Sequence, residues 1–140
     1  MKALKLVLCL FLSSIVLVGC GKPSPLVGRW STMQPFGDAS GMATAELLLE
    51  HQGEVISGTF TFKTLPEAAK KELGGAVSFQ IEQVRFGDGL LSFVVPIAPT
   101  QPKECLFFNL KLDGNQLKGT AKENNPEVDK LLPVEFKKEA

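Results

Sequence analysis

The chain has 140 residues, and its 15 lysines and arginines are balanced by 15 aspartates and glutamates. This balance lacks the basic excess of a nucleic-acid-binding surface, so we expect no nucleic-acid partner. With one histidine and three cysteines, the chain offers no converging set of ligands for a metal, and we expect neither a metal nor a cofactor.

The first nineteen residues have the layout of an export signal. Lys2 and Lys5 supply a positive start, and the apolar run Leu6–Val18 follows. A helix that spans a bilayer needs about 20 apolar residues, so this shorter run predicts a signal-peptide helix instead. The alternative is an uncleaved anchor in which the cysteine that follows is buried.

The signal ends in Leu17-Val18-Gly19-Cys20, which resembles the lipobox of bacterial lipoproteins. The resemblance implies that the Cys20 sulfur receives a diacylglycerol and that cleavage then makes Cys20 the N-terminus. Fatty acyl chains of the palmitate class would anchor the protein to a bacterial membrane, where it would face the periplasm or the cell exterior. Two or three acyl chains make such an anchor effectively permanent. Gly21, in a position where aspartate often retains lipoproteins at the inner membrane, favours the outer membrane if the cell is Gram-negative.

These features divide the chain into a signal peptide (1–19), a lipidated N-terminus with a short tether (20–26) and one domain (27–140). Cleavage removes two lysines and leaves two more acidic than basic side chains. Cys9 leaves with the signal and Cys20 is acylated, so Cys105 remains as the single thiol. The domain must therefore fold without an internal disulfide, which its size permits.

From Val27 onward, apolar and polar residues alternate with a period of two, which predicts strands. Glycine-containing turns at 52–54, 87–89 and 113–115 indicate hairpins between them. With Val27–Gln34 as the first strand, the pattern predicts eight strands. Consecutive antiparallel strands with one apolar face tend to close, because closure removes exposed edges. The predicted fold is all-β, an eight-stranded antiparallel up-and-down meander barrel.

One segment departs from this alternation, and two others resemble each other. Pro66, a run of helix-forming residues and a glycine pair at 74–75 predict one short helix over residues 66–73, lying across a barrel mouth. Residues 47–59 and 108–120 also form a weak internal repeat of a strand, a glycine turn and a strand with an inward glycine. The repeat predicts two similar hairpins, which arose either by duplication or by convergence on the same turn chemistry.

The first strand begins with Gly28-Arg29-Trp30, which resembles the Gly-x-Trp start of lipocalins and related calycin barrels. In those barrels the tryptophan plugs the closed end. The resemblance implies a barrel over Leu26–Lys138 and leaves the ligand open. The chain departs from the lipocalin pattern because it has no tyrosine, and because Lys137 and Lys138 stand where a lipocalin places an arginine over the tryptophan.

Inward-facing aromatic side chains are the candidate ligand-contacting residues. They either line an apolar cavity for a hydrophobic ligand or fill the barrel as a solid core. Leu48, Phe107 and Phe36 are predicted to face outward and to form a partner-binding patch if they are contiguous. The candidate cavity residues are Trp30, Phe60, Phe62, Phe79, Phe93 and Phe108.

We expect no enzyme. His51 is either a base or metal ligand with a neighbouring glutamate, or an exposed turn residue, and no nucleophile–base–orienting set accompanies it. The sequence therefore predicts a membrane-anchored lipoprotein with a non-enzymatic barrel that binds a protein or another envelope component through loops at one barrel end. The alternatives are a lipocalin-like carrier of a small hydrophobic ligand and an inhibitor of another cell's enzyme.

Overall fold

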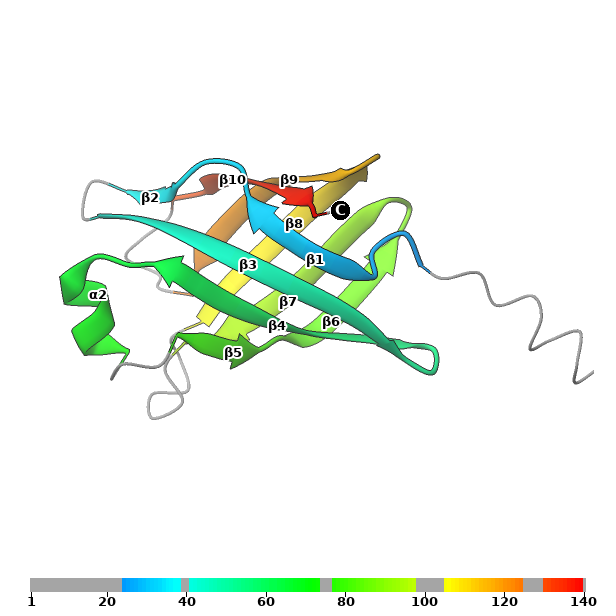
Figure 1. Cartoon of the computed structure of the whole chain (residues 1–140), viewed down its shortest axis with the longest axis horizontal. Helices are drawn as coiled ribbons and strands as arrows, with labels where there is room; N and C mark the ends of the chain where they lie inside the picture. The colour runs from blue at the N-terminus through cyan, green and yellow to red at the C-terminus, as the bar shows by residue number, and fades with distance from the viewer. Residues whose placement is uncertain (1–23, 39–40, 74–76, 98–104, 125–129, 140) are drawn as a thin grey trace, which may run out of the picture.

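A computed structural model describes residues 24–38, 41–73, 77–97, 105–124 and 130–139 (Figure 1). The signal peptide and Cys20 lie outside these residues. The described chain folds into an all-β antiparallel barrel with one short helix, which confirms the predicted fold class. The strands are β1 (Gly28–Thr32), β2 (Phe36–Asp38), β3 (Gly41–Gln52), β4 (Val55–Thr64), β5 (Ser78–Gln80), β6 (Glu82–Gly87), β7 (Leu90–Pro96), β8 (Cys105–Asp113), β9 (Gln116–Glu123) and β10 (Leu132–Lys138), and the helix is α2 (Glu67–Glu72).

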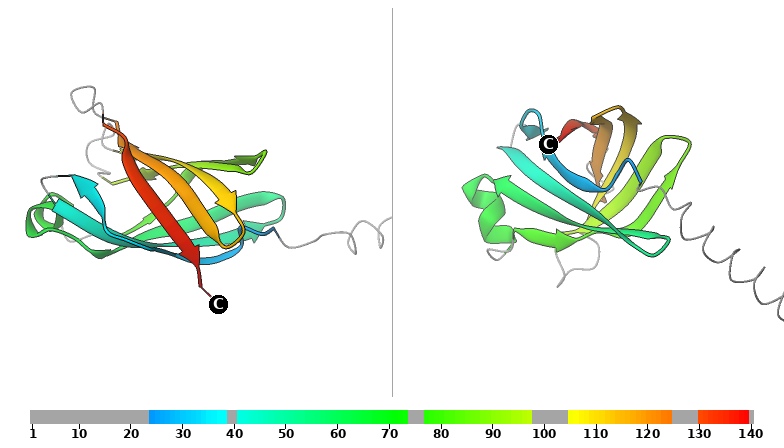
Figure 2. Two further views of the ribbon diagram at one scale, coloured as in Figure 1. Left: turned by 90° about the horizontal axis from the view of Figure 1, so that it is seen from above. Right: turned by 45° about the vertical axis from the view of Figure 1, so that its right-hand side comes forward.

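The strands form one sheet in the order β5-β4-β3-β1-β10-β9-β8-β7-β6, with β2 paired to β3. The two ends of this order, β5 and β6, are consecutive in the chain and meet at Ile81. Its backbone N–H donates a hydrogen bond to the carbonyl of Gly58 (3.1 Å). The segment that contains Ile81 therefore pairs with β4 before this residue and with β7 after it. This brings the two edges of the sheet together. In Figure 2, β9 and β10 cross over the layer formed by β3 and β4.

The described residues form ten strands and not the predicted eight, because one additional strand forms and one predicted strand is divided. The first ends at Thr32, and the chain then pairs with β3 again as β2, within a stretch predicted to be a loop. The fourth is divided at Ile81 into β5 and β6. Gln83 has a positive φ of 52°, and the register shifts there between Glu82 and Arg85. Periodicity alone does not detect such local bends.

The two repeated hairpins, β3–β4 and β8–β9, have the same register. Leu49 pairs with Gly58 in the first, and Leu110 pairs with Gly119 in the second. A Cβ atom added to Gly58 would lie 2.3 Å from a carbonyl oxygen of β3, and one added to Gly119 would lie 1.9 Å from a carbonyl oxygen of β8. Both glycines therefore allow a close approach of the neighbouring strand, as the repeat predicts.

Aromatic rings fill the centre of the barrel. The ring of Phe108 stacks on Phe93 at a centroid distance of 4.8 Å, and it lies 5.2 Å from Phe60 and 6.4 Å from Phe136. All four side chains are at most 1% exposed. Rings from four strands therefore form one continuous core of the kind found in close-packed protein interiors.

Trp30 contacts both the segment that leads into β1 and the last strand, β10. Its indole N–H donates a hydrogen bond to the carbonyl of Leu26 (2.8 Å), and the ring is fully buried. The Lys138 Nζ atom lies 5.6 Å from the ring centroid and donates a hydrogen bond to the carbonyl of Pro25 (3.0 Å). A lysine thus takes the place that the lipocalin resemblance assigns to an arginine, with a cation–π contact worth about 0.5–1 kcal/mol.

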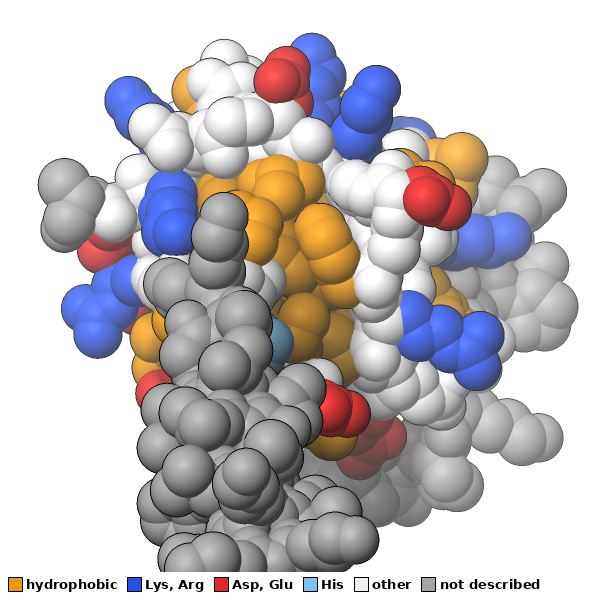
Figure 3. Space-filling model, turned by 90° about the vertical axis from the view of Figure 1, so that its right-hand side faces the viewer, with side chains coloured by type: hydrophobic (Ala, Val, Ile, Leu, Met, Phe, Trp, Pro, Cys, Tyr) orange, Lys and Arg blue, Asp and Glu red, His pale blue; other side chains and the backbone are white. Residues whose placement is uncertain are grey.

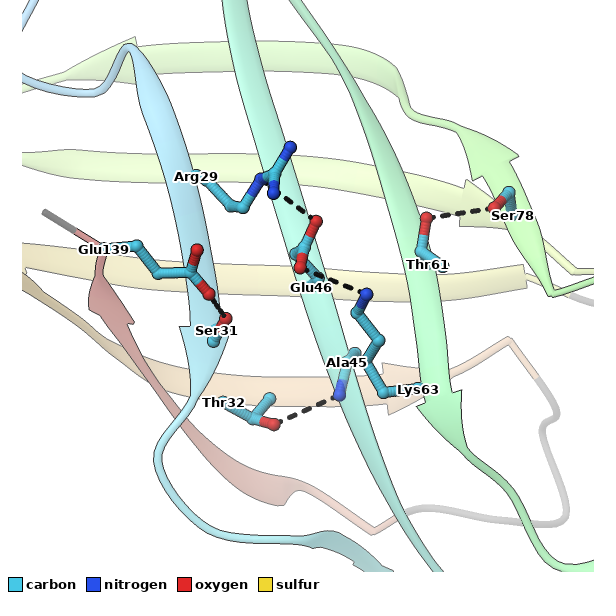
Figure 4. A network of polar contacts seen from close by, with 9 residues as sticks. All are labelled: Arg29, Ser31, Thr32, Ala45, Glu46, Thr61, Lys63, Ser78 and Glu139. Atoms are coloured by element: carbon cyan, nitrogen blue, oxygen red, sulfur yellow. Dashed lines mark hydrogen bonds and ion pairs between the residues drawn. The ribbon is translucent and has the colours of Figure 1, made fainter.

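The outer face of the barrel carries polar side chains, as the alternation requires (Figure 4). The carboxylate of Glu46 on β3 forms ion pairs with Arg29 on β1 (3.2 Å) and Lys63 on β4 (3.3 Å). Hydroxyls of Thr61 and Ser78 are hydrogen-bonded between β4 and β5 (3.0 Å). Exposed pairs of this kind each contribute less than about 1 kcal/mol, so the buried core supplies most of the stability.

The helix confirms the prediction for residues 66–73, with Pro66 as its N-cap and Leu73 as its C-cap. Glu67 in its first turn and the lysines in its last turn match the helix dipole. In the described part of the chain, no helix is both long enough and apolar enough to cross a bilayer.

Candidate ligand-binding pocket

A pocket of about 250 Å³ lies at the end of the barrel that α2 borders. Side chains from β2, β4, α2 and the segments around β7, β8 and β10 surround it. Most of these side chains are apolar, as is usual for pockets that bind small molecules. The principal apolar lining residues are Phe36, Phe62, Leu65, Leu73, Ile97 and Leu106.

Small residues of β3 and α2 form part of the pocket lining. They are Gly41 and Ala43 of β3 and Ala68 and Ala69 of α2. A Cβ atom added to Gly41 would lie 2.2 Å from the Cγ atom of Pro66. The glycine therefore lets the start of the helix pack directly against β3, while the alanines keep the volume behind that contact free.

Glu123, at the end of β9, is the charged residue among the described side chains that line the pocket. Its side chain is half-buried. A carboxylate near a largely apolar pocket repels an anionic ligand group and attracts a cationic one. The pocket is therefore suited to an uncharged or cationic amphiphile, with the apolar part inside.

The six candidate cavity residues predicted from the sequence all belong to one packed cluster. Phe62 lies where this cluster meets the pocket. Its ring is 5.0 Å from that of Phe60 and 6.1 Å from that of Phe79. Trp30, Phe93 and Phe108 lie in the barrel core, where neighbouring side chains surround them completely.

Of the residues predicted to face outward, Phe107 is exposed as expected, whereas the prediction for Phe36 and for a contiguous patch is wrong. Phe36 is buried, because β2 pairs Phe36 with Ala43 at the start of β3 and directs the ring inward, 6.4 Å from the ring of Phe108. Leu48 on β3 and Phe107 on β8 are separated by β1, β10 and β9 in the sheet. They therefore form no contiguous surface.

Sequence reasoning missed most of the lining residues. Phe36, Leu65, Leu73 and Ile97 lie in segments that the alternation assigned to loops or to the helix. The pair Ala68-Ala69 is a usable signal, since small residues on one helix leave space against the barrel wall. Nothing in the two-residue period shows which segments meet at this end.

The remaining reactive side chains are not among those that line the pocket. His51 is exposed in the β3–β4 hairpin, and the described residues contain no group of three side chains suited to hold a metal. Burial raises the pKa of the half-buried Cys105 thiol; a hydrogen bond with Asn124 opposes this shift, and the charge of Glu82 adds to it. A thiol with a raised pKa stays protonated at neutral pH and is a poor nucleophile.

No protein-family model and no curated protein matches the sequence. Among solved structures, the chain is similar to the crystal structure of Echinococcus granulosus fatty-acid-binding protein 1, with 9% sequence identity and a TM-score of 0.49. The match covers 83% of this chain and 98% of that one. A likeness at this level identifies neither a family nor a ligand.

Proposed function

We propose that the protein is a membrane-anchored lipoprotein whose barrel binds a small hydrophobic ligand in the pocket beside α2. The observation that carries the proposal is the pocket itself, which has a volume of about 250 Å³ and is lined mainly by apolar side chains. This volume lies just below the roughly 300–1,000 Å³ of pockets that bury drug-sized molecules. A short alkyl chain or a compact apolar group matches it better than a long lipid.

Glu123 narrows the ligand class. In a site of reduced dielectric constant, a carboxylate disfavours a second negative charge nearby. The proposed ligand is therefore an uncharged or cationic amphiphile, not a fatty-acid anion. In this proposal the ligand binds in the pocket, and the aromatic core around Phe108 supports the side chains that line it.

The filled core also favours a second candidate function, which is the binding of an envelope protein through one end of the barrel. A barrel with a filled interior can bind a partner only through its outer surface, which is how an interaction module binds. The two candidates differ in whether an apolar probe enters the pocket.

Replacement of Ala69 by tryptophan tests the ligand-binding proposal. The indole would fill much of the pocket from α2, and we expect the affinity for the uncharged probe N-phenyl-1-naphthylamine to fall at least about tenfold, which corresponds to 1.4 kcal/mol. Probe fluorescence during titration of the purified protein measures the change. Lys71→Trp, on the same helix but exposed, is the matched control and should bind within about twofold of the unmodified protein.

Two outcomes would contradict the ligand-binding proposal. One is that the unmodified protein does not bind the probe, which would leave the interaction module as the better candidate. The other is equal loss of binding in Ala69→Trp and Lys71→Trp, because then a general effect on the helix and not occupation of the pocket would explain the result. Circular dichroism verifies that both variants keep the β-rich fold.

Replacement of Cys20 by alanine tests the anchor. Without the sulfur no thioether to diacylglycerol can form, so we expect the variant to keep its signal or to be released from the membrane fraction. Fractionation of cells and mass spectrometry of the product measure this outcome. A Cys20→Ala protein that stays in the membrane fraction with the mass of a cleaved, acylated chain would refute lipidation at this residue.

A further inference from the structure

The chain enters the barrel at a fixed position. Leu26 is fully buried, and its carbonyl accepts the hydrogen bond of the Trp30 indole. The carbonyl of Pro25 accepts a hydrogen bond from Lys138 on the last strand. The direction from which the N-terminal tether reaches the domain is therefore set by contacts with the barrel itself.

This entry lies at the end of the barrel opposite the pocket. Gly28 at the start of β1 pairs with Leu49, close to the β3–β4 turn, whereas α2 follows the other end of β4 (Figure 1). The strand β3 has twelve residues, and at about 3.3 Å per residue it separates the two ends by about 40 Å along the strand. We call the end with the β3–β4, β6–β7 and β8–β9 turns the entry end.

Apolar side chains are exposed at the entry end. Val55 in the β3–β4 hairpin is 66% exposed, and Leu90 in the β6–β7 hairpin is 57% exposed. Ile56 and Phe86 lie next to them, half-buried against the core. Between these two hairpins the strands are not hydrogen-bonded to each other, because β6 pairs with β7 and not with β4. Figure 3, which faces this end, shows hydrophobic side chains gathered at its centre and framed by charged ones.

Exposed apolar residues also occur at the pocket end, where Met42 is 50% exposed and Leu131 is 59% exposed. Exposure alone therefore does not select one end. The length of the tether selects the entry end. Only four residue steps separate Cys20 from Ser24, the first described residue, and these steps span at most about 14 Å. An acylated Cys20 holds the entry end at the membrane surface and leaves the pocket end about 40 Å further along the strands.

We propose that the entry end docks on the bilayer that holds the anchor, with Val55 and Leu90 inserted, and that the pocket faces away from that bilayer. This inference rests on the lipid anchor of the proposed function. Side chains of this kind enter the boundary of headgroups and acyl chains to a depth of about 5–10 Å. Glu54 and Asp88, the carboxylates beside the two tips, keep the insertion shallow because they must remain hydrated.

The docked orientation has a consequence for ligand exchange. A pocket that faces away from its own membrane exchanges ligand with the aqueous compartment, with a partner protein or with an opposing membrane. Extraction directly from the anchoring bilayer would require the barrel to turn over on a tether that is too short for this movement.

Site-directed labelling of the acylated full-length product tests the orientation. In a Cys105→Ser background, single cysteines replace Val55, Leu90, Met42 or Leu131, and each carries the environment-sensitive fluorophore NBD. The proteins are reconstituted in phosphatidylcholine vesicles that contain nitroxide-labelled lipid. We expect a blue shift of the emission and loss of at least about half of the intensity at positions 55 and 90, as insertion at headgroup depth requires. Positions 42 and 131 should resemble water-exposed controls.

The outcomes separate the orientation from the anchor. Equal quenching at all four positions, or stronger quenching at positions 42 and 131, in a chain that cosediments with the vesicles and has the mass of an acylated product overturns the docking alone. A chain without acyl mass that fails to cosediment overturns both the anchor and the docking that rests on it. Neither result depends on the binding of a ligand in the pocket.

Discussion

Replacement of Phe108 by alanine is expected to lower the free energy of unfolding by about 3–5 kcal/mol. The Phe108 ring contacts rings from four other strands, so its removal leaves a cavity that rigid neighbours cannot fill. A domain of this size typically has a total stability of about 5–15 kcal/mol, so this loss is a large part of it. Urea unfolding followed by far-ultraviolet circular dichroism measures the change.

The neighbouring residue provides the matched control. Phe107 lies on the same strand and loses the same atoms on mutation to alanine, but it points outward and is 37% exposed. We expect Phe107→Ala to lower the stability by no more than about 1 kcal/mol, because removal of a partly exposed ring leaves no closed cavity. Similar losses for the two variants would mean that the Phe108 ring is not at the centre of a packed core.

The sequence was sufficient to predict which face of most strands is buried. In β8, the alternation places Leu106, Phe108 and Leu110 inside, and the structure buries all three. This works because side chains in a strand point to opposite faces, so a single buried face imposes a period of two. The alternation also places Val77 inside with Phe79, but the Val77 side chain is exposed. It lies just before the first residue of β5, at the edge of the regular strand.

The bend of the wall at Ile81 and the pocket were not predictable from the pattern. The bend depends on Gln83 in an unusual backbone conformation, and glutamine carries no sequence signal for positive φ. The pocket depends on the meeting of β2, α2 and the ends of β7 and β8, which are distant in the sequence. Contacts between such segments follow from the closure of the whole barrel, and a local period contains no information about them.

Targeting and fold are predicted from different kinds of evidence. The proposed anchor depends on a short motif ending in Cys20, in which one sulfur is chemically required. The barrel depends on a repeated physical pattern spread over about 110 residues that tolerates exceptions. A single substitution can therefore abolish anchoring without affecting the fold, whereas loss of the fold requires damage at a position where several strands meet.

Gly119 is such a position, and Gly119→Ala is expected to lower the stability by about 3 kcal/mol, at the upper end of the usual cost of overpacking. An added Cβ would lie 1.9 Å from the carbonyl oxygen of Asn109 and 2.9 Å from the Cα atom of Leu110. Both are backbone atoms of the neighbouring strand, so no side-chain rotation relieves the contact. The β8–β9 ladder must separate locally, which weakens its hydrogen bonds.

Gly87→Ala is the control that isolates steric contact from the general effect of replacing glycine. Gly87 also lies in a strand and its φ is not positive, but an added Cβ would have no heavy atom within 4 Å. Its replacement should be neutral or stabilising by about 0.4–1 kcal/mol, because alanine reduces the entropy of the unfolded chain. Chemical unfolding of both variants measures the difference. If Gly119→Ala were as stable as Gly87→Ala, the inward glycine of the repeated hairpin would not be needed for the close approach of β8 and β9.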